Sequence, residues 1–314
     1  MGRGPAMVRR PAALIPRFPR NAPDFIDIPS ALGCATARYR TRVHQFRARN
    51  ISLARNPGEP NCRLVRIHNM RRTITAWATL LLAVAFAAAP FVTEPFQGYD
   101  GNQLPVPQDS PPIQPAGWAF SIWGIIYLWL IVSAAFGLKS RGDDPEWEKV
   151  RGPLLIALAV GVPWLAVANE SALLATVMIF LMAGGAIAAL LRTPIFDRWT
   201  LRHPVGLFAG WLTAASFVSL GATAAGYGLV LGPTGWAWVC LPLALLVAAA
   251  VQSRPQVSPA YGIAVIWALT GIMVKNAPAG ASPGIATLAL LGILLIAALI
   301  LRPLATRLLA RREG

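Results

Sequence analysis

Aromatic side chains gather in one stretch of this sequence, Pro115-Ala-Gly-Trp-Ala-Phe-Ser-Ile-Trp-Gly-Ile-Ile-Tyr127, which continues as apolar sequence to Leu138. Because the stretch carries no charge, its chemistry is that of indole and phenol rings, which pack as apolar bodies and offer one polar tip each. At about 100° per residue, Trp123 and Tyr127 share one helix face, while Trp118 and Trp129 share another. The pattern predicts a helix whose rings can line a pocket between neighbouring helices.

Neighbouring apolar segments supply further candidates for this pocket. Asn169 and Glu170 end one segment, Lys275 ends another, and Trp211 and Trp267 lie deeper in theirs. We therefore expect a pocket that opens to the outer side, with an indole floor and with Glu170 and Lys275 as a polar pair at its mouth. The expected ligand-binding residues are Trp118, Phe120, Trp123, Tyr127, Trp164, Asn169, Trp211 and Trp267. Packing between helices is the alternative for most of these rings, and interfacial anchoring is the alternative for Trp118.

Few residues of the sequence could support catalysis, metal binding or ion transport. His203 is the single histidine after residue 69, and the apolar segments contain no interior carboxylate. No Ser-His pair, HExxH motif or phosphate-binding glycine loop is present, so we predict no enzyme, no catalytic residue and no metal site. The lack of ionisable groups at membrane depth also argues against ion-coupled transport.

The composition is that of an integral membrane protein. Of 314 residues, 55% are hydrophobic and 13% are charged, whereas a soluble domain has about 25% charged residues. The net charge of +15 does not indicate nucleic-acid binding, because the basic residues of the body lie beside apolar segments, where they orient helices in the bilayer.

The apolar runs predict an all-α fold with about eight transmembrane helices. Fourteen of the fifteen Lys and Arg residues from Met70 onward fall on one side of these segments, and Lys275 falls on the other. By the positive-inside rule, both termini are then cytoplasmic, which predicts a multi-pass protein of the plasma or inner membrane. The expected spans are Thr73 to Val92, 117 to 138, Pro153 to Ala168, Ser171 to Leu191, Val205 to Gly226, Trp236 to Gln252, Pro259 to Val274 and Pro283 to Leu301.

Residues 1–69 are rich in Arg and Pro and show no sustained apolar period, and Met70-Arg-Arg directly precedes the first apolar run. We therefore expect a disordered basic leader, with Met70 as the true start of the protein. The alternative is a basic cytoplasmic tail that touches anionic lipid. The segment Thr73 to Val92 is expected to be retained, although it also has features of a cleaved signal peptide.

The prolines, Trp118, Phe120, Trp123 and Tyr127 together resemble the second transmembrane helix of the TspO/MBR family, the tryptophan-rich sensory or translocator proteins, in a longer bacterial branch. Trp211-Leu-Thr-Ala-Ala-Ser-Phe-Val-Ser219 is similar to the fifth helix of that family, and Tyr261 to Lys275 is similar to an added helix. Ser219 stands where compact members often carry Asn, which puts a polar contact there in doubt. The resemblance implies a five-helix core over residues 70–226 and a three-helix extension over residues 227–314.

The resemblance also implies a function: binding of a flat, hydrophobic ligand, porphyrin or sterol-like, in a sensory or regulatory role without an established reaction. One alternative is a permease or transporter component for an apolar or amphipathic solute. Another is a structural membrane protein whose Gly206-x-x-x-Gly210 face packs on a partner or on a second copy as a homodimer. The expected partners are the lipid bilayer and the hydrophobic ligand, with no nucleic acid.

Overall fold

The computed structural model of the protein describes residues 62–94, 96, 98–99, 103–278 and 281–310. Contacts along the chain separate residues 1–63 from a helical body of residues 64–314. Residues 1–61 of the predicted leader lie outside the described residues. The first described helix begins at Cys62, well before the predicted start at Thr73, so residues 62–69 are helical.

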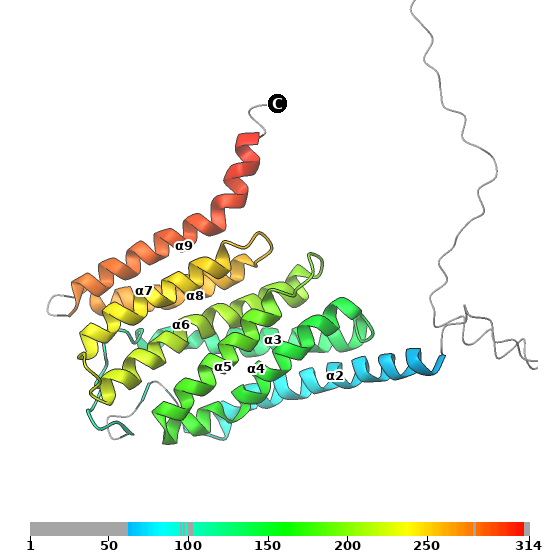
Figure 1. Ribbon diagram of the computed structural model, residues 1–314, viewed down its shortest axis with the longest axis horizontal. Coiled ribbons are helices and arrows are strands. Elements are labelled where there is room, and N and C mark those ends of the chain that lie inside the picture. The colour runs from blue at the N-terminus through cyan, green and yellow to red at the C-terminus, as the bar shows by residue number, and fades with distance from the viewer. Residues whose placement is uncertain (1–61, 95, 97, 100–102, 279–280, 311–314) are drawn as a thin grey trace, which may run out of the picture. The chain divides into compact units, whose positions relative to one another are not determined.

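The described part of the chain is all-helical, which confirms the predicted fold class (Figure 1). Short pieces precede or follow the long helices: the 3₁₀ turns η1 (Ala89–Phe91) and η3 (Gly117–Ser121), and the π-helical turn η4 (Arg198–Arg202). The long helices are α2 (Cys62–Ala88), α3 (Ile122–Ser140), α4 (Pro145–Glu170), α5 (Ala172–Leu190), α6 (His203–Gly226), α7 (Pro233–Gln252), α8 (Pro259–Asn276) and α9 (Pro283–Ala310).

Seven of the described helices are long and apolar enough to cross a membrane, which fits the predicted polytopic protein. The exception is α8, which forms at the predicted place but has only 18 residues and ends in the polar pair Lys275 and Asn276. It is the shortest of the eight long helices in the described part of the chain.

The helix starts follow from local capping. Asp144 accepts a hydrogen bond from the backbone N–H of Glu146, and Pro145 follows it at the first helical position, where its missing N–H has no cost. This cap begins α4 at Pro145, eight residues before the predicted start of the span at Pro153. Ser258 caps α8 in the same way through the N–H of Ala260.

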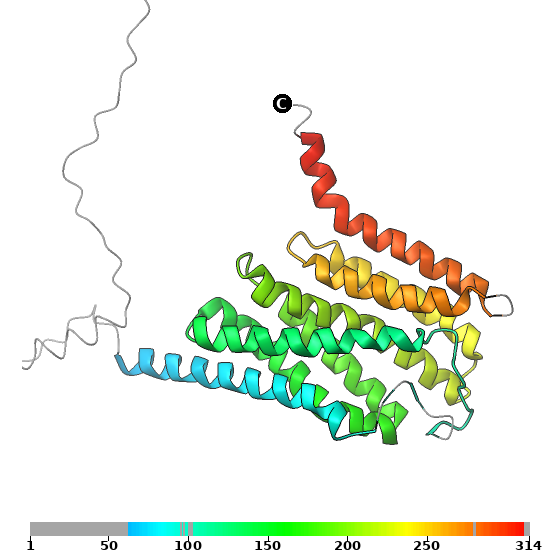
Figure 2. The same cartoon turned by 180° about the vertical axis from the view of Figure 1, so that it is seen from behind.

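The helices run alongside one another, with α2 at one edge of the body and α9 at the other (Figures 1 and 2). The central element is α6, which packs against α3, α5, α7 and α8 and buries most of its residues. One end of the bundle carries the α3–α4, α5–α6 and α7–α8 connections and is called the arginine end here. The opposite end, called the proline end, carries the long connection from α2 to η3.

Two glycines of α6 bring this helix very close to α8. A Cβ atom at Gly206 would lie 2.8 Å from the Cβ of Ser258, and one at Gly210 would overlap the backbone carbonyl of Tyr261. The predicted close helix approach at this Gly-x-x-x-Gly sequence is therefore present. The alternative in which this face packs on another subunit does not hold, because α8 of the same chain covers it. A homodimer through another surface stays a prediction.

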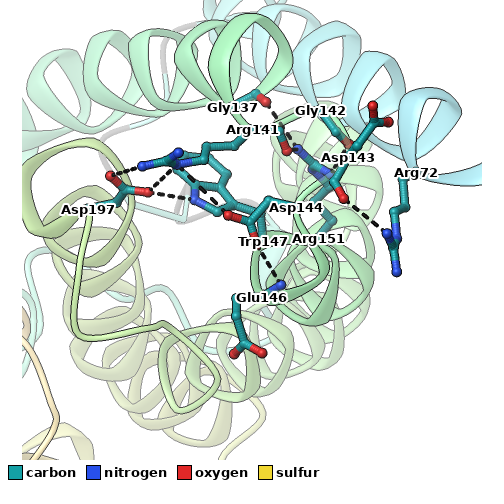
Figure 3. A network of polar contacts seen from close by, with 10 residues as sticks. All are labelled: Arg72, Gly137, Arg141, Gly142, Asp143, Asp144, Glu146, Trp147, Arg151 and Asp197. Atoms are coloured by element: carbon teal, nitrogen blue, oxygen red, sulfur yellow. Dashed lines mark hydrogen bonds and ion pairs between the residues drawn. The ribbon is translucent and has the colours of Figure 1, made fainter. Parts of the chain in front are cut away.

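A polar network joins the connections at the arginine end (Figure 3). The carboxylate of Asp197, in the α5–α6 connection, accepts hydrogen bonds from Nε of Arg141 at 2.8 Å and from the indole N–H of Trp147 at 2.9 Å. Asp197 has a left-handed backbone with φ 55°, a conformation that Asp adopts more readily than most residues. The network ties the segment before α6 to the α3–α4 connection.

The Asp197 carboxylate predicts a pH-dependent stability. The hydrogen bond from Arg141 holds the pKa of Asp197 below its ordinary value of 3.8, with a smaller contribution from Trp147. Because the folded-state pKa is the lower one, the stabilisation is present above pH 3.8 and is lost as pH falls through the folded pKa. We expect the Asp197→Asn variant to lose only about 1 kcal/mol of unfolding free energy at neutral pH, because the partly exposed Arg141 is screened by solvent. The stability of this variant should also fall less steeply as the pH is lowered. Unfolding midpoints of both proteins between pH 2.5 and 7 measure this difference. The same fall in stability at acid pH in both proteins would contradict the prediction.

Candidate functional site

A cavity of about 600 Å³, measured with its opening, lies between the proline-rich connection and helices α3, α4, α5, α6 and α8. About 50 Å³ of this is enclosed space, which is less than the roughly 300–1,000 Å³ of typical small-molecule pockets, so a bound ligand would also occupy the opening. The lining is mostly aromatic and aliphatic and consists of Phe96, Gly98, Tyr99, Gln114, Pro115, Phe120, Trp123, Trp164, Ile179, Trp211, Ala214, Ala215, Val218, Ser219, Ala222 and Ala268.

Aromatic rings hold one another edge to face along the cavity wall. The ring of Trp211 meets Phe120 at 5.9 Å and Trp123 at 6.0 Å between centroids, both nearly perpendicular. On the other side of the cavity, Phe96 meets Trp164 at 5.3 Å in the same geometry. Edge-to-face pairs are favoured by the ring quadrupole, so these walls are fixed by packing before any ligand binds.

A group of hydroxyls forms one polar corner of the cavity. Tyr99 Oη lies 2.5 Å from Ser219 Oγ, which lies 2.7 Å from Thr176 Oγ1, and Thr176 in turn contacts Thr223 Oγ1 at 2.9 Å. Burial raises the pKa of the Tyr99 hydroxyl, so this group stays protonated and can donate. The doubt about a polar contact at Ser219 is thereby answered, since a serine here joins α6 to α5 and to the loop.

One polar atom of the wall has no partner. The indole Nε1 of Trp211 is buried and forms no hydrogen bond within the described residues, and the residue is only 2% exposed. In contrast, the buried Trp164 donates to the carbonyl oxygen of Ala175 at 2.9 Å. Leaving a buried N–H unpaired costs about 1–3 kcal/mol, so an acceptor supplied by a bound molecule would remove that cost.

Helix α8 holds the proline-rich segment over the cavity. Lys275 Nζ donates to the carbonyl oxygen of Pro111 and Asn276 Nδ2 to that of Pro112, both at 2.8 Å. Further along, the N–H of Ala116 donates to Gly271 and the indole of Trp267 to Ala119, at 3.1 and 2.8 Å. The three-helix extension therefore positions residues 111–119, which include the cavity residues Gln114 and Pro115.

The structure brings together half of the predicted ligand-binding residues: Phe120, Trp123, Trp164 and Trp211 line the cavity. Tyr127 lies behind this wall, where it stacks on Trp123 with centroids 5.3 Å apart. Trp118 and Trp267 contact each other edge to face outside the lining, and both are partly exposed. The amide of Asn169 donates to the carbonyl oxygen of Glu94 instead.

The expected pair between Glu170 and Lys275 does not form. Lys275 bonds to the Pro111 carbonyl, and Glu170 is exposed at the end of α4. No ion pair joins the two within the described residues. Their common position at the proline end is correct, but a backbone oxygen is the partner of the lysine.

The prediction missed Phe96, Tyr99 and Gln114, which reach the cavity from the α2–α3 connection. No helical period marks residues in an irregular segment, so position alone gives no sign of which side chains turn inward. The available signal was composition, because Phe96 and Tyr99 are large aromatic residues in a loop that also carries several prolines.

Comparison with known proteins gives one family. A family model described as TSPO-like protein matches residues 73–302, which is most of the chain and includes every helix from the middle of α2 to α9. No curated protein and no solved structure matches.

Proposed function

Because the chain belongs to the TSPO-like protein family, we propose that it binds a flat, hydrophobic ligand of tetrapyrrole or sterol type in the cavity between η3, α3 and α6. The role is sensory or regulatory, and the protein catalyses no reaction. The observation that carries the proposal is the unpaired indole N–H of Trp211 in an otherwise aromatic wall. The wall would stack on the ligand rings, and Trp211 would donate to an oxygen or nitrogen acceptor on the ligand.

The cavity fits this class of ligand in two respects. Its aromatic rings suit a flat face, and its hydroxyl corner at Tyr99 and Ser219 suits a polar substituent. Phe120, Trp123, Trp164 and Trp211 are the residues that would hold a porphyrin. A bound porphyrin would absorb light, so its absorption band would measure how much of the site is occupied.

The proposal also includes a location. The distribution of Lys and Arg supports a plasma or inner membrane protein whose arginine end faces the cytoplasm. The cavity, at the proline end, would then be reached from the outer side. Protease access to a site inserted in the α2–α3 connection of sealed vesicles distinguishes this orientation from the reverse.

We expect the Trp211→Phe variant to bind a free-base porphyrin about tenfold more weakly, which corresponds to one lost hydrogen bond of about 1.4 kcal/mol. Trp77→Phe, a change at an exposed position on α2, is the matched control and should bind as tightly as the unaltered protein. Because the chain has 11 tryptophans, the porphyrin absorption band is a cleaner readout than total indole quenching.

Flux of the same porphyrin across liposomes separates binding from transport. Saturable binding without flux supports a sensory role, whereas protein-dependent flux favours the permease alternative. Absence of saturable binding above lipid-only vesicles would contradict the proposed function.

A further inference from the structure

A second unpaired donor lies at the opposite end of the bundle. Arg202, where η4 passes into α6, is 8% exposed, and its Nε and Nη2 atoms are shielded from solvent without a hydrogen-bond partner in the described part of the chain. The hydroxyl of Thr200, two residues earlier, is likewise buried and unpaired. Three polar atoms without partners thus occur within three residues of one turn.

No acidic group of the described residues neutralises Arg202. The carboxylate of this connection, Asp197, is engaged by Arg141 and Trp147, and the charged group acting on Arg202 is another cation, Arg198. A guanidinium stays protonated in proteins, so it cannot escape the cost of burial by losing its proton. A buried cation without a counter-ion is strongly unfavourable, which indicates that an anion from outside the protein completes this site.

The surroundings indicate where the anion comes from. Trp199 is 72% exposed next to the site, and Ile195 and Phe196 on the same connection are exposed as well. The carbonyl oxygen of Trp199 accepts a hydrogen bond from the indole of Trp129 at 2.9 Å, which fixes this segment against α3. Exposed aromatic residues beside basic ones at the end of membrane helices are typical of the headgroup level of a bilayer.

We propose that residues 195–202 form a binding site for the phosphate of a membrane phospholipid, with Arg202 as the anion-binding residue and Arg198 as the second cation. The planar fork of an arginine matches two phosphate oxygens, and a rotamer change of this long side chain would carry the guanidinium from its shielded position to the interface. The acyl chains then lie along the apolar surface at Phe196 and Trp199. This site is separate from the aromatic cavity and does not depend on its ligand.

The test is thermal unfolding of the full chain in detergent with added lipid. We expect phosphatidylglycerol to raise Tm by several degrees, while diacylglycerol, which lacks the phosphate, does not. Arg202→Gln should lose more than half of that lipid-dependent rise, and Arg202→Lys should recover part of it, because the charge returns without the fork. Arg254→Gln, which removes an exposed cation from the α7–α8 connection at the same end, should keep the full rise.

Three results would overturn the proposal. Equal losses for Arg202→Gln and Arg254→Gln would show general electrostatic attraction without a site. An equal rise with inorganic phosphate alone would show a phosphate site that needs no lipid. If Arg202→Gln does not fold, a phospholipid with a photoreactive headgroup, used on the unaltered protein, must label the peptide that contains residues 195–202, and labelling elsewhere rejects the site.

Discussion

Replacing Gly210 by alanine is expected to lower the free energy of unfolding by about 3 kcal/mol, at the upper end of the range for overpacked cores. The added Cβ would overlap the carbonyl oxygen of Tyr261 and come within 3.0 Å of the Cβ of Ala264. Because the obstacle is backbone and not the tip of a flexible side chain, no rotamer change removes the overlap. Helix α8 must move away from α6.

That movement would also break a buried hydrogen bond. Tyr261 is fully buried, and its hydroxyl donates to Thr213 Oγ1 at 3.1 Å across the α6–α8 contact. A displaced α8 would further pull on the segment that it holds over the cavity through Gly271 and Lys275. We therefore expect Gly210→Ala to weaken porphyrin binding as well as stability, although residue 210 itself does not line the cavity.

Gly184→Ala is the matched control. Gly184 lies inside α5, and a Cβ there would meet nothing within 4 Å. Alanine is the better helix former, so this change should be neutral or stabilise by about 0.5–1 kcal/mol. Thermal or denaturant unfolding in detergent compares the two variants, and a similar loss in both would mean that the α6–α8 contact does not determine the effect.

The sequence predicted the helices well because each is a long apolar run between charged or proline-rich segments, a signal that requires no partner. It also located the close approach at Gly206 and Gly210, since small residues at this spacing leave room for a helix backbone. It did not identify the neighbour. Ser258 and Tyr261 lie at the start of α8, and sequence periodicity does not connect α8 to α6. The sequence therefore does not show whether the glycine face of α6 is free or covered by α8.

The cavity was predicted only in part, because sequence spacing gives the direction of side chains on regular helices alone. Trp123 and Trp211 lie on regular helices, where spacing gives direction, and both reach the cavity. Tyr99 lies in an irregular segment, where spacing gives none. The partner of Lys275 could not be predicted either, because a backbone carbonyl such as that of Pro111 carries no residue-type signal, whereas an acidic residue such as Glu170 does.

Replacing Arg151 by methionine should also destabilise the protein by about 3 kcal/mol, because it removes a buried cation that several acceptors share. Arg151 in α4 is 3% exposed and donates to the carbonyl oxygens of Gly137, Arg141 and Gly142 at 2.8–3.1 Å (Figure 3). These carbonyls belong to the last turn of α3 and to the residues just after it. Those of Gly137 and Arg141 also accept backbone N–H groups, so Arg151 supplies their second hydrogen bond. The side chain thus fastens the end of α3 to α4.

Lys149→Met is the control for this variant. Lys149 lies two residues away on α4 and pairs with Glu146 at 2.5 Å, but its side chain is largely exposed, and such pairs contribute little to stability. We expect a loss within about 0.5 kcal/mol for this change, compared with the much larger loss for Arg151→Met. Equal losses would mean that charge on α4 matters, and not the contacts of Arg151 with α3.

A double variant separates two reasons for the loss. Arg151 also lies 3.5 Å from the carboxylate of Glu148, which accepts a second hydrogen bond from Thr75 of α2 at 2.6 Å. If the cost of Arg151→Met comes mainly from leaving Glu148 without its cation, adding Glu148→Gln should restore a large part of the stability, because a neutral amide still accepts from Thr75. If the cost comes from the lost hydrogen bonds to the backbone carbonyls at the end of α3, the second change should restore nothing. We expect the smaller recovery, since three of the four contacts of Arg151 are to backbone oxygens.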